Sequence, residues 1–188
     1  MPTYLKESDQ KGKQGHLIFD PKATNEFITT NLVSSGWRKA RIPAAWAFFG
    51  IDVDSSKNGV IVEAQFSNYP FLINNVFRTE LFVRHLVCLP VAPTQLLVVV
   101  TKSHIFPASN STLYFEQGKA QLSALSTDNL FSIPVRLVGL TVDYGKAKAK
   151  FTDYKAARYS RTVVASKAIN CDVSIGKDKD ARSSIIKL

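Results

Sequence analysis

Apolar positions repeat with helical spacing in two parts of the chain. Over residues 21–35 the spacing predicts an amphipathic helix, which Asp20 and Pro21 would begin and Gly36 would end. A longer apolar stripe predicts a second helix over residues 71–89. Charged side chains are expected on the solvent face of this second helix: Arg78, Glu80 and Arg84.

Between and after these helices, runs of β-branched and apolar residues predict strands. Residues 60–66 open with three β-branched side chains, and residues 96–101 form an unbroken apolar run typical of a strand covered on both faces. Turn-forming residues fill positions 55–59. Further strand candidates are residues 113–115, 135–142 and 161–172. This order of elements predicts an α/β fold in which helices flank a central mixed β-sheet.

Length and composition set limits on the class of protein. A chain of 188 residues has the length of one domain. No apolar run approaches the roughly 20 residues that span a bilayer, and no signal peptide is visible at positions 1–10. Cys88 and Cys171 are too few for a disulfide framework or a zinc site. We therefore expect a cytoplasmic protein with no membrane partner, in which the polar residues 6–14 form a surface arm.

The net charge of +9 is unevenly distributed along the chain. Residues 143–188 carry 11 of the 24 basic side chains but only 5 of the 15 acidic ones, so this last quarter holds most of the excess. Basic surfaces attract polyanions because binding releases the condensed counterions. The charge therefore favours a nucleic-acid partner over a protein that is basic for solubility alone.

Asp54, Glu63 and Gln65 form the constellation with the clearest chemistry. Glu63 and Gln65 are two residues apart on a predicted strand, so their side chains share a face. A hairpin through residues 55–59 would bring Asp54 beside Glu63. Two such carboxylates suit Mg²⁺, which can activate water and neutralise charge on a phosphate. A solvated hairpin without a catalytic role is the alternative that the pattern leaves open.

The spacing Asp-x₈-Glu-x-Gln resembles a variant of the PD-(D/E)xK nuclease signature. Residues 61–75, IVEAQFSNYPFLINN, are similar to the catalytic segment of the BglII/BstYI family of type II restriction endonucleases. Similar blocks follow the family order at residues 6–36, 110–117 and 133–140. The resemblance implies one endonuclease domain over residues 1–188, with a family-like core at 1–142 and a basic C-terminal extension at 143–188. No family segment is recognisable in that extension, which could be a basic arm or a dimer element.

The resemblance also implies an activity and a set of site residues. It implies a Mg²⁺-dependent homodimer that cuts double-stranded DNA at a GATC-centred palindrome and leaves 5′ overhangs. Asp54 and Glu63 would hold the metal, and Gln65 would stand where most relatives have Lys. Base contacts would come from two pairs of short polar residues, which suit the edges of bases in the major groove: Ser67 and Asn68, and Asn110 and Ser111.

Gln65 changes the chemistry that this signature predicts. Glutamine carries no charge and cannot accept a proton at neutral pH, so it can only orient water by hydrogen bonding. Deprotonation must then come from water on the metal, from the substrate phosphate or from solvent. We expect a stricter metal dependence than in a relative with Lys at this position.

Four other residues are candidates for contact with the DNA backbone, and each could instead be an ordinary solvated side chain. They are Lys13, Arg84, Lys102 and His104. Three further interpretations stay open at this stage. The chain could be a non-catalytic basic DNA-binding module, a subunit of a heterodimeric nuclease with an asymmetric target, or a repair nuclease on the same core. The segment 38–50 has little room for the helical insertion of the BstYI-like enzymes, so the family's dimer contact could differ here.

Overall fold

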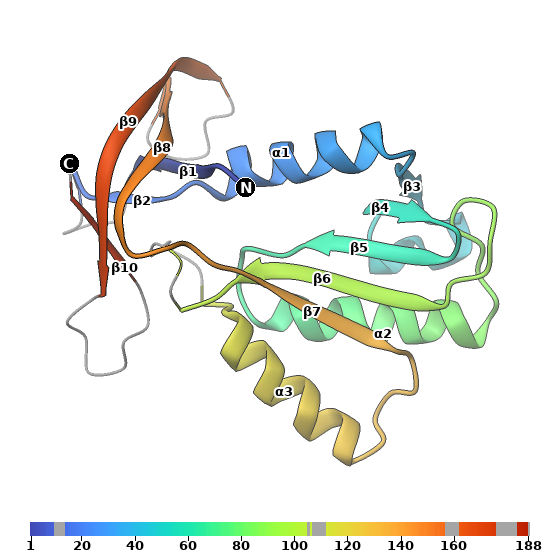
Figure 1. The fold of residues 1–188 in the computed structure, drawn as a ribbon. Helices are drawn as coiled ribbons and strands as arrows, with labels where there is room; N and C mark the ends of the chain where they lie inside the picture. The colour runs from blue at the N-terminus through green and yellow to red at the C-terminus, as the bar shows by residue number, and fades with distance from the viewer. Residues whose placement is uncertain (10–13, 105, 107–111, 157–161, 176–183, 188) are drawn as a thin grey trace. The chain divides into compact units, whose positions relative to one another are not determined.

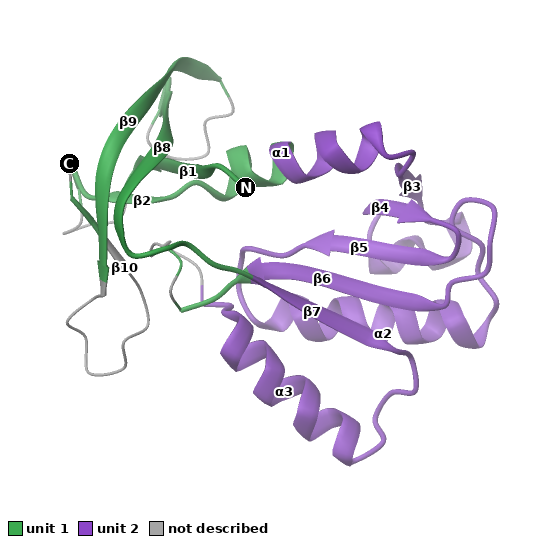
Figure 2. Cartoon of the chain, in the orientation of Figure 1, with its two compact units in different colours: residues 1–26, 102–111, 140–188 green, residues 27–101, 112–139 purple. Residues whose placement is uncertain are grey.

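The computed structural model in Figure 1 describes residues 1–9, 14–104, 106, 112–156, 162–175 and 184–187. The chain divides into two compact units, which are drawn in different colours in Figure 2. Each unit is built around its own five-stranded sheet. No helix in the described part of the chain is long and apolar enough to cross a membrane.

The sheet of the unit formed by residues 27–101 and 112–139 has the strand order β3-β4-β5-β6-β7. Its strands are β3 (Arg38–Arg41), β4 (Asp52–Lys57), β5 (Val60–Ala64), β6 (Leu96–Lys102) and β7 (Val135–Leu140). The pairs β3/β4 and β4/β5 are antiparallel, whereas β5/β6 is parallel. The mixed sheet predicted from the sequence is therefore confirmed, and the strands predicted near 60–66, 96–101 and 135–142 belong to it.

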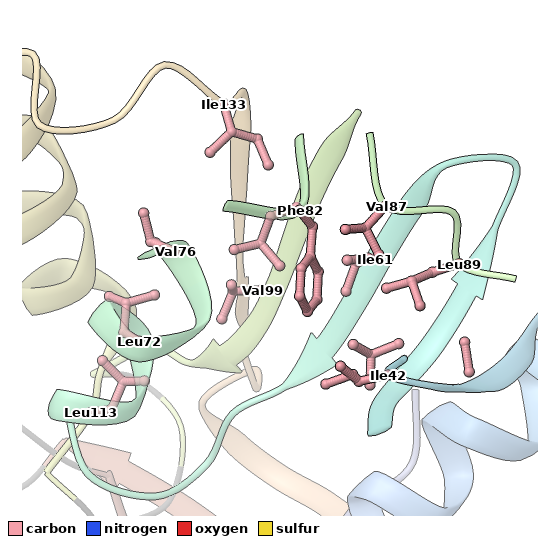
Figure 3. Close-up of a cluster of buried hydrophobic side chains, with 13 residues drawn as sticks. Ile42, Ile61, Leu72, Val76, Phe82, Val87, Leu89, Val99, Leu113 and Ile133 are labelled. Atoms are coloured by element: carbon pink, nitrogen blue, oxygen red, sulfur yellow. The ribbon is translucent and has the colours of Figure 1, made fainter. Parts of the chain in front are cut away.

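Helix α2 (Pro70–Arg84) connects the parallel strands β5 and β6 and covers one face of the sheet. Its apolar stripe packs into the main core, which Figure 3 shows. Leu72, Val76 and Phe82 have no exposed surface, and they pack with Ile61 and Val99 of the sheet. The helix ends sooner than the apolar pattern predicts, at His85, and Leu86 adopts a positive φ of 50°.

Helix α3 (Phe115–Thr127) was not predicted, and the strand expected at 113–115 is wrong. Phe115 begins the helix instead of ending a strand. Gly118 lowers the helix propensity of this segment. A Cβ at that position would lie 3.2 Å from methyl groups of Leu72 and Leu137, which is a tight contact, so the glycine favours close packing there. Tertiary contact thus outweighs local preference.

The turn between β4 and β5 is shorter than the predicted turn of 55–59. Residues 55–57 belong to β4, and only Asn58 and Gly59 form the connection, with φ angles of 50° and 81°. Positive φ at both central residues is typical of the tight hairpin turn that matches the twist of the flanking strands. The turn fixes the register in which Ser55 pairs with Val62.

The other unit, residues 1–26, 102–111 and 140–188, contains a sheet with the order β10-β9-β8-β1-β2. Its strands are β1 (Thr3–Glu7), β2 (Leu17–Phe19), β8 (Gly145–Tyr154), β9 (Val163–Ile175) and β10 (Ser184–Lys187). The predicted arm over 6–14 is wrong at its start, since Lys6 and Glu7 belong to β1. The basic segment 143–188 supplies three strands to the same sheet as the N-terminus.

Helix α1 (Pro21–Ser34) confirms the first predicted helix. The Asp20 carboxylate accepts hydrogen bonds from the backbone N–H groups of Lys22 and Ala23 at 3.0 and 3.1 Å, as an N-cap does. Gly36 follows the helix with φ of 81°. A short 3₁₀ helix, η1 (Ala44–Phe49), lies between β3 and β4.

Candidate active site

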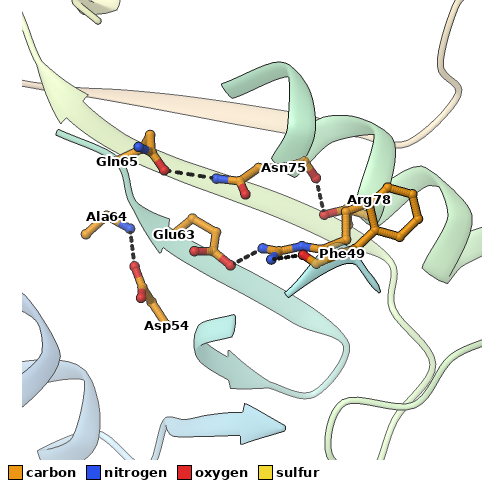
Figure 4. Close-up of polar contacts among 8 residues, drawn as sticks. Phe49, Asp54, Glu63, Ala64, Gln65, Asn75 and Arg78 are labelled. Atoms are coloured by element: carbon orange, nitrogen blue, oxygen red, sulfur yellow. Dashed lines mark hydrogen bonds and ion pairs between the residues drawn. The ribbon is translucent and has the colours of Figure 1, made fainter. Parts of the chain in front are cut away.

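The hairpin of β4 and β5 brings together the two carboxylates that the sequence analysis singled out. Asp54 lies on β4 and Glu63 on β5 (Figure 4). The Asp54 Oδ2 atom accepts a hydrogen bond from the Ala64 backbone N–H at 2.9 Å. The register that pairs Ser55 with Val62 places Glu63 opposite Asp54 on the neighbouring strand. The hairpin therefore holds the two side chains at the same place on β4 and β5.

Glu63 is paired with a buried arginine from α2. The Arg78 Nη2 atom donates to the Glu63 Oε1 atom, and both residues are almost fully buried, with 5% and 7% of their surfaces exposed. The Arg78 Nη1 atom also donates to the Phe49 carbonyl oxygen at 3.4 Å. The sequence pattern does not predict this contact. The expectation that Arg78 and Glu80 lie on the solvent face of the helix is wrong, because both are buried.

The reason for that error is the position of both residues on the helix. Arg78 and Glu80 lie at the two edges of the apolar stripe of α2, where periodicity alone does not decide between core and solvent. A polar residue at such an edge can reach a partner on the sheet. Only the structure shows which partner is there.

Burial and charge act together on Glu63. Burial raises the pKa of its carboxyl group to about 7; the Arg78 guanidinium opposes this shift, and the negative charge of Asp54 adds to it. Two negative charges on these neighbouring carboxylates are therefore unfavourable in this buried environment. A divalent cation beside them would offset those charges.

Gln65 follows β5 directly and extends its pairing with β6, because its backbone N–H donates to the Val100 carbonyl oxygen at 2.8 Å. Its side-chain Oε1 atom accepts a hydrogen bond from the Asn75 Nδ2 atom at 3.3 Å. Its Nε2 atom contacts the Ser67 hydroxyl. Asn75 lies on α2, three residues before Arg78, and the sequence pattern does not predict its contact with Gln65.

The first pair of predicted base-contacting residues follows β5. Ser67 and Asn68 are exposed, and the Asn68 Oδ1 atom accepts a hydrogen bond from the Thr112 hydroxyl at 3.3 Å. Asn110 and Ser111 lie outside the described residues, as does Lys13. Thr112, which follows Ser111 directly, nevertheless lies next to Asn68.

The remaining backbone-contact candidates differ in their surroundings. Arg84 has an exposed side chain, and its Nε atom donates to Glu80 at 2.8 Å. Lys102 at the end of β6 is fully buried, and burial lowers the pKa of its amine to about 8. His104 is half-buried. Of these three side chains, only that of Arg84 is exposed at the surface.

The donors present at Asp54 and Glu63 fit Mg²⁺. No cluster of three or more His, Cys, Asp or Glu side chains that could hold an ion occurs within the described ranges. Mg²⁺ does not require one, because it keeps several waters and is commonly held by one or two carboxylates together with substrate phosphates. The Oδ1 atom of Asp54 and the Oε2 atom of Glu63 are the oxygens that the bonds to Ala64 and Arg78 leave for a cation.

Comparison with known proteins identifies the family. A family profile described as "Restriction endonuclease BglII/BglIII" matches residues 3–140. The type II restriction enzyme BglII of Bacillus subtilis is 45% identical over 165 residues, which cover 87% of this chain and 74% of that protein. The chain belongs to the BglII family of restriction endonucleases. The family resemblance of the sequence and the expected enzyme class, a type II site-specific deoxyribonuclease, are thereby confirmed.

Solved structures agree with this assignment. The crystal structure of BglII complexed with a DNA 16-mer matches with a TM-score of 0.92 and 40% identity, and the match covers 100% of this chain and 86% of that chain. Free BglII matches with a TM-score of 0.68 and 38% identity, over 92% of this chain and 81% of that chain. The expected restriction-endonuclease fold is confirmed. Residues 143–188 do have a counterpart in the BglII complex, contrary to the expectation from the sequence.

Proposed function

We propose that this BglII-family enzyme hydrolyses phosphodiester bonds of double-stranded DNA with Mg²⁺ bound by Asp54 and Glu63. The observation that supports the proposal is the hairpin register that sets these two carboxylates side by side on β4 and β5, where the Ala64 backbone N–H also fixes Asp54. When bound, the cation would supply charge neutralisation at the scissile phosphate and an acidified water. The protein itself would position the two carboxylates for the cation and bind the DNA beside them.

Gln65 would orient the attacking water. Its amide is neutral, so it neither repels the phosphate nor removes a proton. Its Oε1 atom is engaged by Asn75 and its Nε2 atom by Ser67, which restricts the rotation of the amide. An amide held in this way can present a fixed polar group to the attacking water. In-line attack by that water would give 5′-phosphate and 3′-hydroxyl ends.

Recognition would use the polar segment that follows the catalytic strand. Ser67 and Asn68 lie only two and three residues beyond Gln65, so base contacts made there would be close to the cleavage site. The match of these two residues and of Asn110 and Ser111 to the base-contacting positions of the family favours a GATC-centred palindrome, and the family resemblance implies 5′ overhangs. A palindrome presents two equal half-sites, so we propose a homodimer. The DNA 16-mer in the crystal structure of BglII supports a duplex substrate.

Contacts to the DNA backbone would come from basic residues outside the catalytic hairpin. The candidates are the exposed Arg84, the half-buried His104 and Lys13, which lies outside the described residues; Lys102 is fully buried and drops out. The exposed lysines at alternate positions of β8 add positive charge to the other sheet: Lys146, Lys148 and Lys150. Contacts of this kind position the duplex without reading its sequence.

Digestion of phage DNA of known sequence, followed by sequencing of the fragment ends, tests this function. We expect discrete fragments with Mg²⁺, none with EDTA, and ends that share a GATC core with 5′ overhangs. DNA binding without cleavage would identify a binding module. An asymmetric target would indicate a heterodimer, and cleavage without sequence preference would indicate a repair nuclease. Any of these three results would overturn the proposal.

A further inference from the structure

Arg78 is a buried cation in the catalytic hairpin's immediate surroundings, and the proposed mechanism gives it no role. Its guanidinium is bonded at two points, to the Glu63 carboxylate and to the Phe49 carbonyl oxygen. Only 5% of its surface is exposed, and its Nε atom has no hydrogen-bond partner among the described residues. Burying a guanidinium with an unsatisfied nitrogen destabilises the fold. A functional role for Arg78 would explain why this cost is tolerated.

The geometry of the pair points to a directional effect on Glu63. Arg78 reaches across from α2 and engages the Oε1 atom of Glu63 only. A planar guanidinium fixes the plane and the direction of the carboxylate that it binds. The Phe49 carbonyl holds the other end of the guanidinium, so this support does not move freely.

We propose that Arg78 is a positioning residue, which fixes the Glu63 carboxylate so that its remaining oxygen is available to the divalent cation. The inference rests on the proposed function, since it takes Glu63 as a metal ligand. Residues that hydrogen-bond a metal ligand orient it and strengthen binding, and their loss usually costs about 10- to 100-fold in metal affinity or activity. Arg78 fits that description through a single short contact across the β5–α2 interface.

An opposite role for the same contact makes the inference testable. If Arg78 competed with the cation for Glu63, its removal would strengthen metal binding instead of weakening it. The two roles therefore differ in the sign of one measured affinity. A purely structural role would change the melting temperature and leave that affinity unchanged.

The experiment measures Mn²⁺ binding to the full chain by the loss of the free-ion EPR signal, together with Mg²⁺-dependent cleavage. The variants are Arg78→Met, which removes the charge at similar length, and Arg78→Lys, which keeps the charge but not the fork of donors. Glu63→Gln gives the level expected when the ligand is lost. Phe82→Leu, in the core side of the same helix, controls for loss of stability alone.

We expect Arg78→Met to weaken Mn²⁺ binding about 10- to 100-fold, towards the Glu63→Gln level, and Arg78→Lys to recover part of the loss. Phe82→Leu should lower the melting temperature without changing Mn²⁺ affinity. Unchanged or stronger Mn²⁺ binding by the two Arg78 variants would overturn the inference. If Arg78→Met fails to fold, the result with Arg78→Lys decides. Failure of the proposed function would look different, since Glu63→Gln would then bind Mn²⁺ as well as the wild type.

Discussion

Two buried glutamates in this molecule are each paired with an arginine of α2, but their pKa values are shifted in opposite directions. Glu63 is 7% exposed and Glu80 is 4% exposed. Burial raises the pKa of Glu63 to about 7, since one arginine does not offset it and Asp54 adds a like charge. At Glu80, burial also acts to raise the pKa, but hydrogen bonds from Arg84 and the 132–133 segment lower it to about 2.

The difference lies in the number of donors around each carboxylate. Glu80 receives hydrogen bonds from Arg84, from the Ser132 backbone and hydroxyl groups, and from the Ile133 backbone, all at 2.8 to 2.9 Å. Its oxygens are fully used, and it joins α2 to the segment before β7. Glu63 keeps an oxygen that Arg78 does not engage. A saturated carboxylate stabilises the fold, whereas an under-saturated one beside a second carboxylate can bind a cation.

The largest expected effect follows from removing the charge of the under-saturated glutamate. Glu63→Gln should lower the rate of DNA cleavage with Mg²⁺ by about 10³-fold or more, because a metal ligand is lost. Its melting temperature should also fall, since the buried Arg78 guanidinium loses its counter-charge. Single-turnover cleavage and thermal unfolding measure the two effects. Cleavage at the wild-type rate would refute the assignment of the site.

Sequence spacing was sufficient to predict that Asp54 and Glu63 lie side by side, because a hairpin imposes simple geometry on nearby residues. It was insufficient to predict the contacts of Asn75 and Arg78. Those contacts depend on how far α2 is rotated against the sheet, and the sequence leaves that rotation open at the edges of the apolar stripe. Glu80 was misplaced for the same reason.

The strands at the two ends of the chain show a second limit. β1 pairs in parallel with β8, so that Leu5 lies opposite Phe151. Short polar strands such as β1 carry no local periodic signal, and they become strands because a distant partner supplies hydrogen bonds. Likewise lysines and alanines alternate along β8 because Ala149 lies in the core whereas the neighbouring Lys148 and Lys150 are exposed. Nothing near these segments in sequence predicts the pairing.

Removing the charge of the saturated glutamate should affect stability and leave metal binding intact. Glu80→Gln leaves one acceptor oxygen where the carboxylate had two, so several donors lose their partner. We expect the free energy of unfolding to fall by about 2 to 3 kcal/mol, the range for hydrogen bonds to a charged group. Metal affinity should not change. Urea unfolding and Mn²⁺ binding test this, and a stability equal to wild type would contradict the anchoring role.

Acid should reveal the same anchor without a mutation. A carboxylate with a lowered pKa stabilises the fold above its unfolded pKa of about 4.5, and this contribution is lost as the pH falls towards about 2. The shift corresponds to about 3 kcal/mol. The stability difference between wild type and Glu80→Gln should therefore shrink when urea unfolding is repeated from pH 5 down to about pH 2.5. A difference that stays constant over this range would show that Glu80 does not titrate as the structure implies.

The smallest effect is expected at Asn75, which supports the uncharged member of the site. Asn75→Leu removes the donor at 3.3 Å from the Gln65 amide, so Gln65 should orient water less well and cleavage should slow by about 10-fold. Mn²⁺ affinity should not change, because the two carboxylates keep their own contacts. A double-mutant cycle with Gln65→Ala separates this role from a general effect on α2. If Asn75 acts through Gln65, Asn75→Leu will have no further effect on the rate once Gln65 is alanine. An equal loss in both backgrounds would mean that Asn75 acts on the fold, and that only the charged residue of β5 depends on a partner from the helix.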